Sequence, residues 1–316
     1  MPTSSPLQVE TTSCIVCGSA SGRAVAQGKD YLHASSDQLY QFFECAECSH
    51  LYLNPRPKIE EIARLYPSDY VTFTDAFKGD QSVLAKLKDS VLVSRFKSLA
   101  DALPGDMKLL DVGCGDAQFL LALRRKYPKA RLTGLDWYFS PSVLDQLRAA
   151  NIEAITGTIE SAWLCEGEYD VITMNQLIEH VWDVKLVLDR ACRALKPGGL
   201  LALETPNRQG WDRRFFKSGA WGGYYWPRHL NLFSRPHLAQ LSQARGLRVV
   251  TSVRLLAPPC WILSFRFSLQ RAGLNRLARL FPDTSVILLA GFAMIDTIAT
   301  LLGAETSNQK LILKKL

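Results

Sequence analysis

Two pairs of cysteines near the start of the chain have the spacing of metal ligands. Cys14 and Cys17 lie in "CIVC", and Cys45 and Cys48 lie in "CAEC". Each C-x2-C pair can hold a metal ion through one turn, and two pairs complete a tetrahedron of thiolates, which favours Zn²⁺. Because protein atoms fill all four positions, we expect this zinc to be structural. Four unconnected buried thiols and an iron–sulfur centre are the alternatives.

An aspartate precedes a glycine-rich turn in the second candidate site. "LLDVGCGDAQFL", residues 109–120, places Asp111 at the end of an apolar run and Gly113 and Gly115 before a helical pattern. A strand that enters a helix through glycines exposes backbone N–H groups at the edge of a sheet, where small ligands dock. The G-x-G-x-x-G pattern of dinucleotide sites fails because Gln118 takes the last position, so a nicotinamide cofactor is disfavoured.

From 107 to about 205, short apolar runs alternate with helical patterns. The expected strands are "MKLLDVG", "RLTGLD", "IEAIT", "YDVITMN" and "GLLALETP", and the expected helices are 116–127, 141–150 and 184–195. Further strands are expected at "LRVVTSVRLL" and "QKLILKKL", with a helix near 234–245. The alternation predicts an α/β fold with a mostly parallel seven-stranded sheet and helices on both faces.

The spacing of Asp111, Gly113, Gly115 and Ala117 resembles motif I of class I S-adenosylmethionine (SAM) dependent methyltransferases. The resemblance continues in order through "LTGLD", "GTIES", "YDVITMNQLIEHV" and "LKPGGLLALETPN", and it covers roughly residues 82–254. It implies the Rossmann-like fold of that family and SAM as the cofactor. Only small residues let the backbone approach such a ligand closely.

The resemblance also implies which residues contact SAM. The glycine loop would lie against the methionine part, Asp111 would help to hold its amino group, and Asp136 would accept hydrogen bonds from both ribose hydroxyls. Ile159 and, as a polar candidate, Glu160 would border the adenine. The expected cofactor-binding residues are Asp111, Gly113, Cys114, Gly115, Asp136, Trp137, Ile159, Glu160 and Asn175. The alternatives are a plain tight turn for the glycines, a helix cap for Asp136 and inert packing for Cys114.

The N-terminal segment is similar to one group of bacterial enzymes. "FFECAECSHLYLNPRP", followed by "LYPSDY", looks like the opening of methyltransferases with a four-cysteine domain that act on polysaccharides, deoxysugars and natural products. The sugar C-methyltransferases among them carry a large additional C-terminal domain. This chain continues only briefly after the expected fold, so we expect methylation of oxygen or nitrogen before carbon.

Methyl transfer needs an aligned acceptor and removal of its proton. His229, in "YYWPRHLNLFS", is the first candidate for the catalytic base because similar proteins have His in this H-x-x-x-F setting, and His180, in "IEHV", is the second. We expect Tyr224 and Tyr225 to wall the substrate pocket and Arg228 to hold an anionic group. Structural histidines and hairpin packing of the aromatic residues are the alternatives.

The C-terminal region is apolar with basic residues. "VILLAGFAMIDTIATLLG" (286–303) approaches the length of a membrane span, but Asp296 interrupts it, so we expect a helix packed on the sheet. The segment 269–281 is expected to form a helix with one basic face. Peripheral contact with the inner face of a membrane, for a lipid-linked acceptor, is a hypothesis.

Composition divides the chain and limits its function. We expect a zinc-binding domain at 1–58, a helical linker at 59–105, the SAM-binding domain at 106–254 and a C-terminal helical region with the last strand at 255–316. The start of the chain does not resemble a secretory signal, so we expect a cytoplasmic protein with reduced cysteines. The net charge of +7 permits the alternative of a zinc-dependent nucleic-acid-binding or regulatory protein. Residues 11–50 carry only Arg23 and Lys29 as cations, so nucleic acid is not expected.

Overall fold

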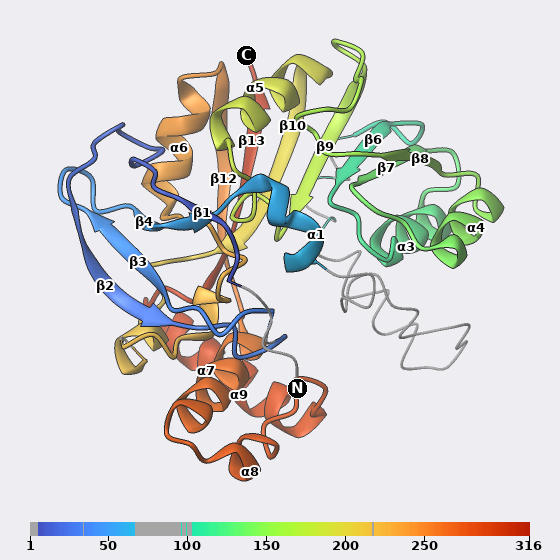
Figure 1. Cartoon of the computed structure of the whole chain (residues 1–316). Coiled ribbons are helices and arrows are strands. Elements are labelled where there is room, and N and C mark those ends of the chain that lie inside the picture. The colour runs from blue at the N-terminus through green and yellow to red at the C-terminus, as the bar shows by residue number, and fades with distance from the viewer. Residues whose placement is uncertain (1–5, 34, 67–95, 97–98, 100–102, 217) are drawn as a thin grey trace.

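A seven-stranded sheet forms the centre of the protein (Figure 1). The computed structural model describes residues 6–33, 35–66, 96, 99, 103–216 and 218–316. The strand order is β8-β7-β6-β9-β10-β13-β12, with parallel pairing from β8 to β10 and with β13 antiparallel to both of its neighbours. The predicted sheet is therefore confirmed. Its strands are β6 (Lys108–Val112), β7 (Arg131–Asp136), β8 (Glu153–Thr156), β9 (Tyr169–Asn175), β10 (Leu195–Pro206), β12 (Leu247–Leu255) and β13 (Asn308–Lys315).

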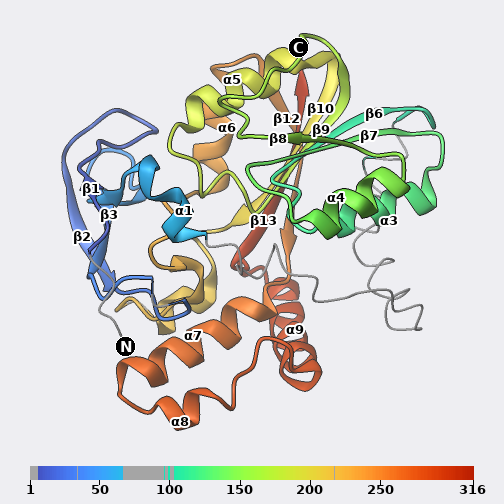
Figure 2. The same cartoon turned by 45° about the vertical axis from the view of Figure 1, so that its right-hand side comes forward.

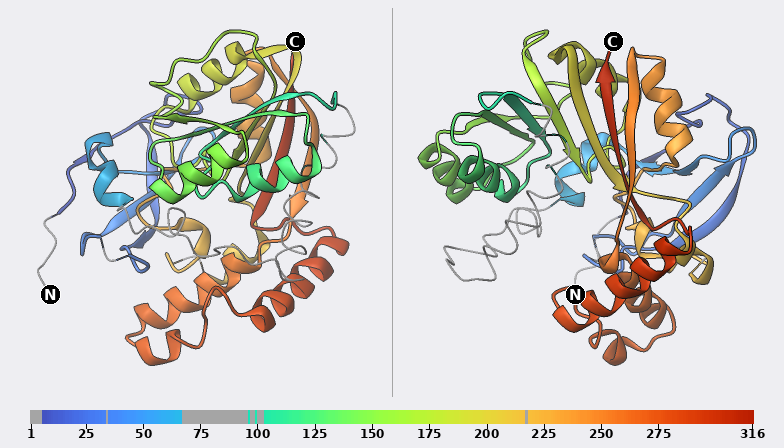
Figure 3. Two further views of the ribbon diagram at one scale, coloured as in Figure 1. Left: turned by 90° about the vertical axis from the view of Figure 1, so that its right-hand side faces the viewer. Right: turned by 180° about the vertical axis from the view of Figure 1, so that it is seen from behind.

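Helices cover both faces of this sheet. In Figures 2 and 3, α3 and α4 lie on one face and α5 and α6 on the other. Each face has its own apolar core, with Leu120 and Leu147 in one and Leu188 and Leu241 in the other. The central strands read as nearly continuous apolar runs because both of their faces are buried. The helices are α3 (Gln118–Lys126), α4 (Pro141–Ala149), α5 (Val184–Ala194) and α6 (Arg235–Gln243).

The turn from β6 into α3 requires backbone that most side chains do not permit. Gly113 and Gly115 have φ of +73° and +54°. A Cβ at Gly113 would lie 2.9 Å from Leu177 Cδ1, so a side chain there would be both strained and overlapping. The glycines therefore bring β6 to α3 with bare backbone at the carboxyl edge of the sheet.

A smaller sheet, of order β11-β4-β3-β2, joins the cysteine-bearing N-terminal residues to a distant part of the chain. β11 (Asn231–Leu232) pairs antiparallel with β4. The sequence did not predict this connection between the predicted domains 1–58 and 106–254, whose boundaries stay predictions. The other strands outside the central sheet are β2 (Gly22–Gly28), β3 (Tyr40–Cys45) and β4 (Leu51–Leu53), and the separate pair β1 (Val9–Glu10) and β5 (Arg56–Pro57).

Three helices, α7 (Pro258–Arg271), α8 (Asn275–Ala278) and α9 (Val286–Leu301), lie together at one end of the molecule (Figure 2). The predicted single helix over 269–281 is wrong, because Gly273, with φ of +75°, turns the chain between α7 and α8. The expected packing of 286–303 on the sheet is also wrong, since α9 packs against α7. Asp296 fixes that contact by accepting hydrogen bonds from Ala257 N and Trp261 Nε1.

No helix in the described part of the chain combines the length and the apolar character needed to cross a membrane.

The predicted linker, 59–105, is described only in part. It contains a 3₁₀ turn, η1 (Ile59–Glu61), and α1 (Ile62–Leu65). From residue 67 onward, the predicted linker lies outside the described residues except for Phe96, Leu99 and 103–105. Phe96 and Leu99 are buried in the core of the α3 and α4 face. Two further 3₁₀ turns, η3 (Trp211–Phe215) and η4 (Gly222–Tyr224), follow β10.

Candidate active site and cysteine cluster

A cavity of about 550 Å³ lies at the carboxyl ends of the parallel strands β6, β7, β9 and β10. Rossmann-like sheets bind their ligands at this edge, because the turns after the strands present backbone N–H groups and helix N-termini there. The turns after these strands form one part of the wall, and residues around α1, η4 and the start of α7 form the rest. The cavity therefore joins parts of the chain that are far apart in sequence.

Most of the predicted cofactor residues line one end of this cavity. Gly115 N donates a hydrogen bond of 2.8 Å to Asp136 Oδ2, so the glycine turn and the end of β7 form one continuous surface. Ile159 and Glu160 face the same space from the segment after β8. The predicted residues in the lining are Gly113, Gly115, Asp136, Trp137, Ile159, Glu160 and Asn175. Their contact with SAM stays a prediction.

The two aspartates predicted to bind SAM, Asp111 and Asp136, differ in position. Asp136 lines the cavity with 6% of its surface exposed, and burial raises its pKa to about 6 although the N–H of Gly115 lowers it. Asp111 lies beneath the glycine loop and is not in the described lining. Its Oδ1 accepts hydrogen bonds from Thr173 Oγ1 at 2.6 Å and from Asn175 Nδ2 at 3.4 Å, while burial raises its pKa to about 7. Asp111 is therefore linked to the cavity wall by its hydrogen bond with Asn175.

Three other predicted residues lie behind the wall of the cavity. Cys114 packs so closely on β7 that a Cβ at Gly134 would lie 2.8 Å from its Sγ. Tyr224 is fully buried against Trp226, with ring centroids 5.1 Å apart. Arg228 forms a buried ion pair of 3.0 Å with Asp30. The contacts that the structure gives these three side chains are internal to the protein.

Arg228 nevertheless affects the ionisation of its partner. Burial raises the pKa of Asp30, but the charge of Arg228 and the hydroxyl of Ser35 outweigh this and hold that pKa below its usual range. The Arg228 Nε also donates to Leu65 O at 2.9 Å. The pair therefore fastens the segment after β10 to the N-terminal residues.

The two predicted catalytic histidines meet at the other end of the cavity. His180 and His229 both line it, and their ring centroids lie 4.7 Å apart. Burial lowers the pKa of both, that of His229 to about 4, so each imidazole is neutral at pH 7. Tyr225, also in the lining, packs 5.1 Å from the ring of His229, so these three residues lie together.

Two residues of this group were missed by the sequence analysis. Tyr66 lines the cavity, and its hydroxyl lies 2.8 Å from His180 Nδ1. Glu179 is fully buried, its Oε2 accepts a hydrogen bond of 2.7 Å from Thr205 Oγ1, and burial raises its pKa to about 8. The adjacency of Glu179 and His180 in "IEHV" was the signal that could have found the carboxylate.

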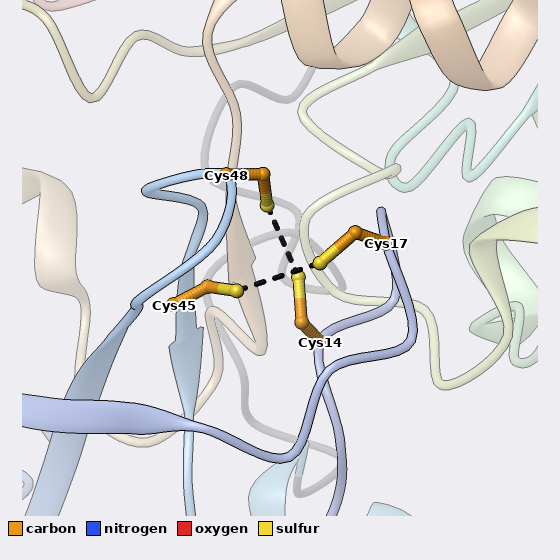
Figure 4. A group of neighbouring side chains, drawn as sticks. All are labelled: Cys14, Cys17, Cys45 and Cys48. Atoms are coloured by element: carbon orange, nitrogen blue, oxygen red, sulfur yellow. Dashed lines mark hydrogen bonds between the residues drawn. The ribbon is translucent and has the colours of Figure 1, made fainter.

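The four predicted metal ligands converge (Figure 4). The Sγ atoms of Cys14 and Cys48 are 3.5 Å apart, as are those of Cys17 and Cys45, and all four lie within 4.8 Å of one another. Burial raises the pKa of Cys45, but the backbone N–H groups of Cys48 and Glu47 outweigh it and lower that pKa to about 7. Four thiol groups aimed at one point form a set of donors that suits a tetrahedral ion.

Comparisons with known proteins agree with this architecture. A family model described as a methyltransferase domain matches residues 85–252, which is more than half of the chain. The chain is 36% identical over 108 residues to a ubiquinone biosynthesis O-methyltransferase of Escherichia coli O7:K1 (strain IAI39 / ExPEC) and 35% identical over 108 residues to that of Escherichia coli K12 / DH10B. In both cases the match covers 33% of this chain and 44% of the relative, so the chain spans less than half of the length of these relatives.

Solved methyltransferases are similar at lower identity. Coclaurine N-methyltransferase bound to N-methylheliamine and SAH is 20% identical, with a TM-score of 0.49 and coverage of 76% of each chain. Geranyl diphosphate methyltransferase in complex with GPP and sinefungin is 15% identical, with a TM-score of 0.46 and coverage of 73% of this chain and 77% of the other.

The fold and the match to the family model define the class of protein: a Rossmann-like methyltransferase. The chain belongs to the methyltransferase-domain family, and the prediction of a SAM-dependent methyltransferase domain is confirmed.

Proposed function

We propose that this protein transfers the methyl group of SAM to an oxygen atom of a small-molecule or lipid-linked acceptor. The observation that carries the proposal is one cavity with Gly115 and Asp136 at one end and His180 and His229 at the other. The first end offers glycine backbone that a nucleoside can approach closely and a carboxylate that can accept hydrogen bonds from ribose hydroxyls. The second end offers nitrogen atoms for the proton of an acceptor. The name of the similar O-methyltransferases supports oxygen as the atom methylated.

The reaction requires no covalent bond between the protein and either reactant. The acceptor oxygen attacks the methyl carbon of the sulfonium, an O–C bond forms, and the C–S bond breaks with its electron pair going to sulfur. The products are the methyl ether and S-adenosylhomocysteine, and the hydroxyl proton passes through an imidazole nitrogen of the two histidines to water. The protein aligns the two reactants and lowers the cost of losing that proton, which is the task assigned to His180 and His229.

The wall near the histidines supports an acceptor with an apolar body. Ile59 and Ile62 line the cavity from the N-terminal side, and Leu256, Pro259 and Leu263 line it around the start of α7. Such side chains gain from contact with an aromatic ring or an isoprenoid chain and gain little from contact with a free sugar. Among the acceptors expected from the sequence, a lipid-linked glycan precursor or an aromatic secondary metabolite therefore fits better than a soluble sugar.

We further propose that the four cysteines hold a structural Zn²⁺. Zinc–sulfur bonds of about 2.3 Å in a tetrahedron place sulfur atoms about 3.8 Å apart. The measured pairs at 3.5 Å are close to that value, and the ion needs only small movements of the side chains. The zinc would stabilise the turns before β2 and after β3 and would take no part in the reaction.

Methyl transfer from [methyl-³H]SAM to a panel of polyprenyl phenols, catechols and sugar nucleotides tests the proposal. We expect turnover with at least one hydroxyl acceptor and a loss of about 10²-fold or more in His229→Ala, with the affinity for SAM unchanged. Asp145→Asn, which removes an exposed carboxylate from α4, is the control and should behave as the wild type. Absence of SAM binding by calorimetry would refute the proposal.

A further inference from the structure

Three side-chain atoms that could hold a metal ion converge at the histidine end of the cavity. Glu179 Oε1 lies 4.0 Å from His180 Nε2 and 3.9 Å from His229 Nε2. Oε1 has no hydrogen-bond partner among the described residues, although Glu179 is fully buried. A buried carboxylate oxygen without a partner is costly, and a cation that displaced the proton of this carboxyl group would remove that cost; none of the described residues pairs with Oε1 as a cation.

The hydrogen bonds of the two rings fix which nitrogen faces Glu179. His229 Nδ1 lies 2.8 Å from Gly223 O, and His180 Nδ1 lies 3.1 Å from Arg228 O. A carbonyl oxygen can only accept, so Nδ1 of His229 donates and its Nε2 is unprotonated. Nδ1 of His180 also lies 2.8 Å from the hydroxyl of Tyr66, which can donate or accept, so both tautomers of this ring fit its contacts, and a metal ion at Nε2 would select the one with the proton on Nδ1. The Nε2 atoms of both rings lie near the unpaired oxygen of Glu179. A backbone carbonyl behind each ring is also the usual support of a metal-binding histidine.

A single proton shared between Glu179 Oε1 and the two Nε2 atoms cannot bridge them. The separations of 3.9 and 4.0 Å exceed the length of a hydrogen bond between nitrogen and oxygen. A metal ion needs more room than a proton, because its bonds to nitrogen and oxygen are each about 2.0 to 2.2 Å. The measured spacing leaves that room, and a contraction of the three side chains by a few tenths of an ångström would complete the bonds.

We propose that Glu179, His180 and His229 bind a divalent first-row metal ion. Two imidazoles and one carboxylate on one side of an ion leave its other positions free, and this set of donors is typical of Fe²⁺ and related ions. The free positions face the cavity, which both histidines line. An acceptor hydroxyl would bind there, its proton would pass to water, and the oxygen would be held for attack on the methyl group.

The inference changes the part that the two histidines play. The role of the ion in holding the acceptor rests on the proposed function. The binding of the ion does not, because it can be measured without turnover. If the ion is present, the Nε2 atoms act as ligands and the ion acidifies the acceptor. Loss of turnover in His229→Ala is expected under either role, so that variant alone does not decide between them.

Manganese binding to the full-length, zinc-loaded protein tests the inference. Mn²⁺ prefers oxygen and nitrogen donors, so the four cysteines are not expected to compete for it. We expect electron paramagnetic resonance to show one bound Mn²⁺ per chain. Glu179→Gln keeps the size of the side chain and an oxygen for Thr205, and it should weaken binding at least about tenfold, as should His180→Gln. Glu160→Gln removes a carboxylate from the other end of the same cavity and should leave Mn²⁺ binding unchanged.

The possible outcomes separate the metal site from the proposed function. No Mn²⁺ binding at about 1 mM, or equal affinity in the wild type and in folded Glu179→Gln, overturns the metal site. Circular dichroism establishes that the variants are folded. Turnover that persists fully after removal of Mn²⁺ and other divalent ions overturns it as well and leaves the methyltransferase proposal intact. Mn²⁺ bound at Glu179 in a protein that does not bind SAM supports the site and refutes the proposed function.

A second inference concerns the outer face of α9. Ile287, Met294, Ile298 and Leu301 recur at helical spacing and are exposed, Ile287 by 84% and Leu301 by 82%. The charged residue of α9, Asp296, is buried against α7 and gives this face no polar group. A stripe of this kind does not suit contact with water alone.

The neighbouring helix adds apolar and cationic side chains. α8 and its flanks expose Leu274, Leu277 and Leu280 beside the exposed Arg276 and Arg279. Figure 2 shows α8 and α9 at the same end of the molecule. α7, against which α9 packs, contributes Pro259 and Leu263 to the wall of the cavity, so this surface is connected to the acceptor end.

We infer that the exposed faces of α8 and α9 lie on an anionic lipid surface. Apolar side chains would enter the boundary between headgroups and acyl chains, and Arg276 and Arg279 would contact the headgroup phosphates. With 16 residues, α9 is shorter than a membrane span, which favours a position in the plane of the surface. A lipid-linked acceptor would reach the cavity from the same side.

Cosedimentation with vesicles of phosphatidylcholine and phosphatidylglycerol tests this surface. We expect the wild type to pellet with anionic vesicles and much less with pure phosphatidylcholine. Ile287→Glu/Leu301→Glu should remain in the supernatant, while Asp145→Asn should pellet as the wild type does. Equal pelleting of the double variant, or no pelleting of the wild type, overturns the inference. A wild-type dimer that the double variant dissociates, without vesicle binding, assigns the face to a second copy and overturns it too.

Discussion

Asp136→Asn should weaken cofactor binding and stabilise the free protein at the same time. The carboxylate lines the cavity, and its Oδ2 accepts a hydrogen bond from Gly115 N. An asparagine can keep that bond through its one oxygen, but it loses the charge and one of the acceptors for the ribose hydroxyls. Hydrogen bonds to charged groups contribute about 1.5 to 3 kcal/mol, so we expect the Kd for SAM to rise between about 10-fold and 150-fold.

The gain in stability follows from the pKa of the buried carboxyl group. Burial raises the pKa of Asp136 from 3.8 to about 6. The unfolded chain therefore ionises first as the pH rises, and the wild-type folded protein loses stability between about pH 4 and pH 6. At 1.36 kcal/mol per pH unit, the loss approaches about 3 kcal/mol at pH 8 and is about half as large at pH 5. A neutral asparagine does not incur this loss.

Urea unfolding and calorimetry at pH 5 and pH 8 measure both effects. The free energy of unfolding of Asp136→Asn should exceed that of the wild type, by more at pH 8 than at pH 5, and by at most about 3 kcal/mol. Asp145→Asn, in an exposed part of α4, should change neither quantity. An unchanged Kd for SAM in folded Asp136→Asn at pH 8 would show that this residue does not hold the cofactor.

Three other substitutions examine how the site is supported. Cys14→Ser should abolish stoichiometric zinc, measured by mass spectrometry of the metal, and should lower the melting temperature by several degrees. Arg228→Met leaves Asp30 buried without its cation, so the free energy of unfolding should fall by about 3 to 5 kcal/mol. Because that pair holds the pKa of Asp30 low, the loss should be largest above pH 4 and should shrink as the pH falls. Asp296→Ala removes the acceptor for Trp261 Nε1 and should cost about 1.5 to 3 kcal/mol, seen as a lower midpoint in urea.

The predictions that the structure confirms were made from patterns of residues close together in the sequence. Strands such as β7 and the turn after β6 could be placed because apolar period, glycine and flanking carboxylate are close in sequence. The sequence "IEHV" shows that Glu179 stands beside His180, but the burial of Glu179 could not be predicted from it, since its partner Thr205 lies 26 residues away and its burial depends on the packing of both segments. Arg228 was expected to meet a substrate, yet its partner Asp30 is 198 residues distant. The sequence shows that a cation is present but not which side chain is buried beside it.

The pairing of β4 with β11 gives the proposed structural zinc a connection to the catalytic end of the cavity. Cys45 and Cys48 flank the turn between β3 and β4, and β11 begins two residues after His229. Leu53 N donates to Leu230 O at 2.9 Å, and His50 Nε2 lies 3.1 Å from Asn231 Oδ1, so the strand that leaves the cysteine cluster directly holds the residues that follow His229. The predicted contacts with SAM lie on a different surface, the glycine turn and the end of β7. Loss of zinc in Cys14→Ser should therefore reduce turnover much more than affinity for SAM, because it loosens the acceptor end and leaves the cofactor end in place.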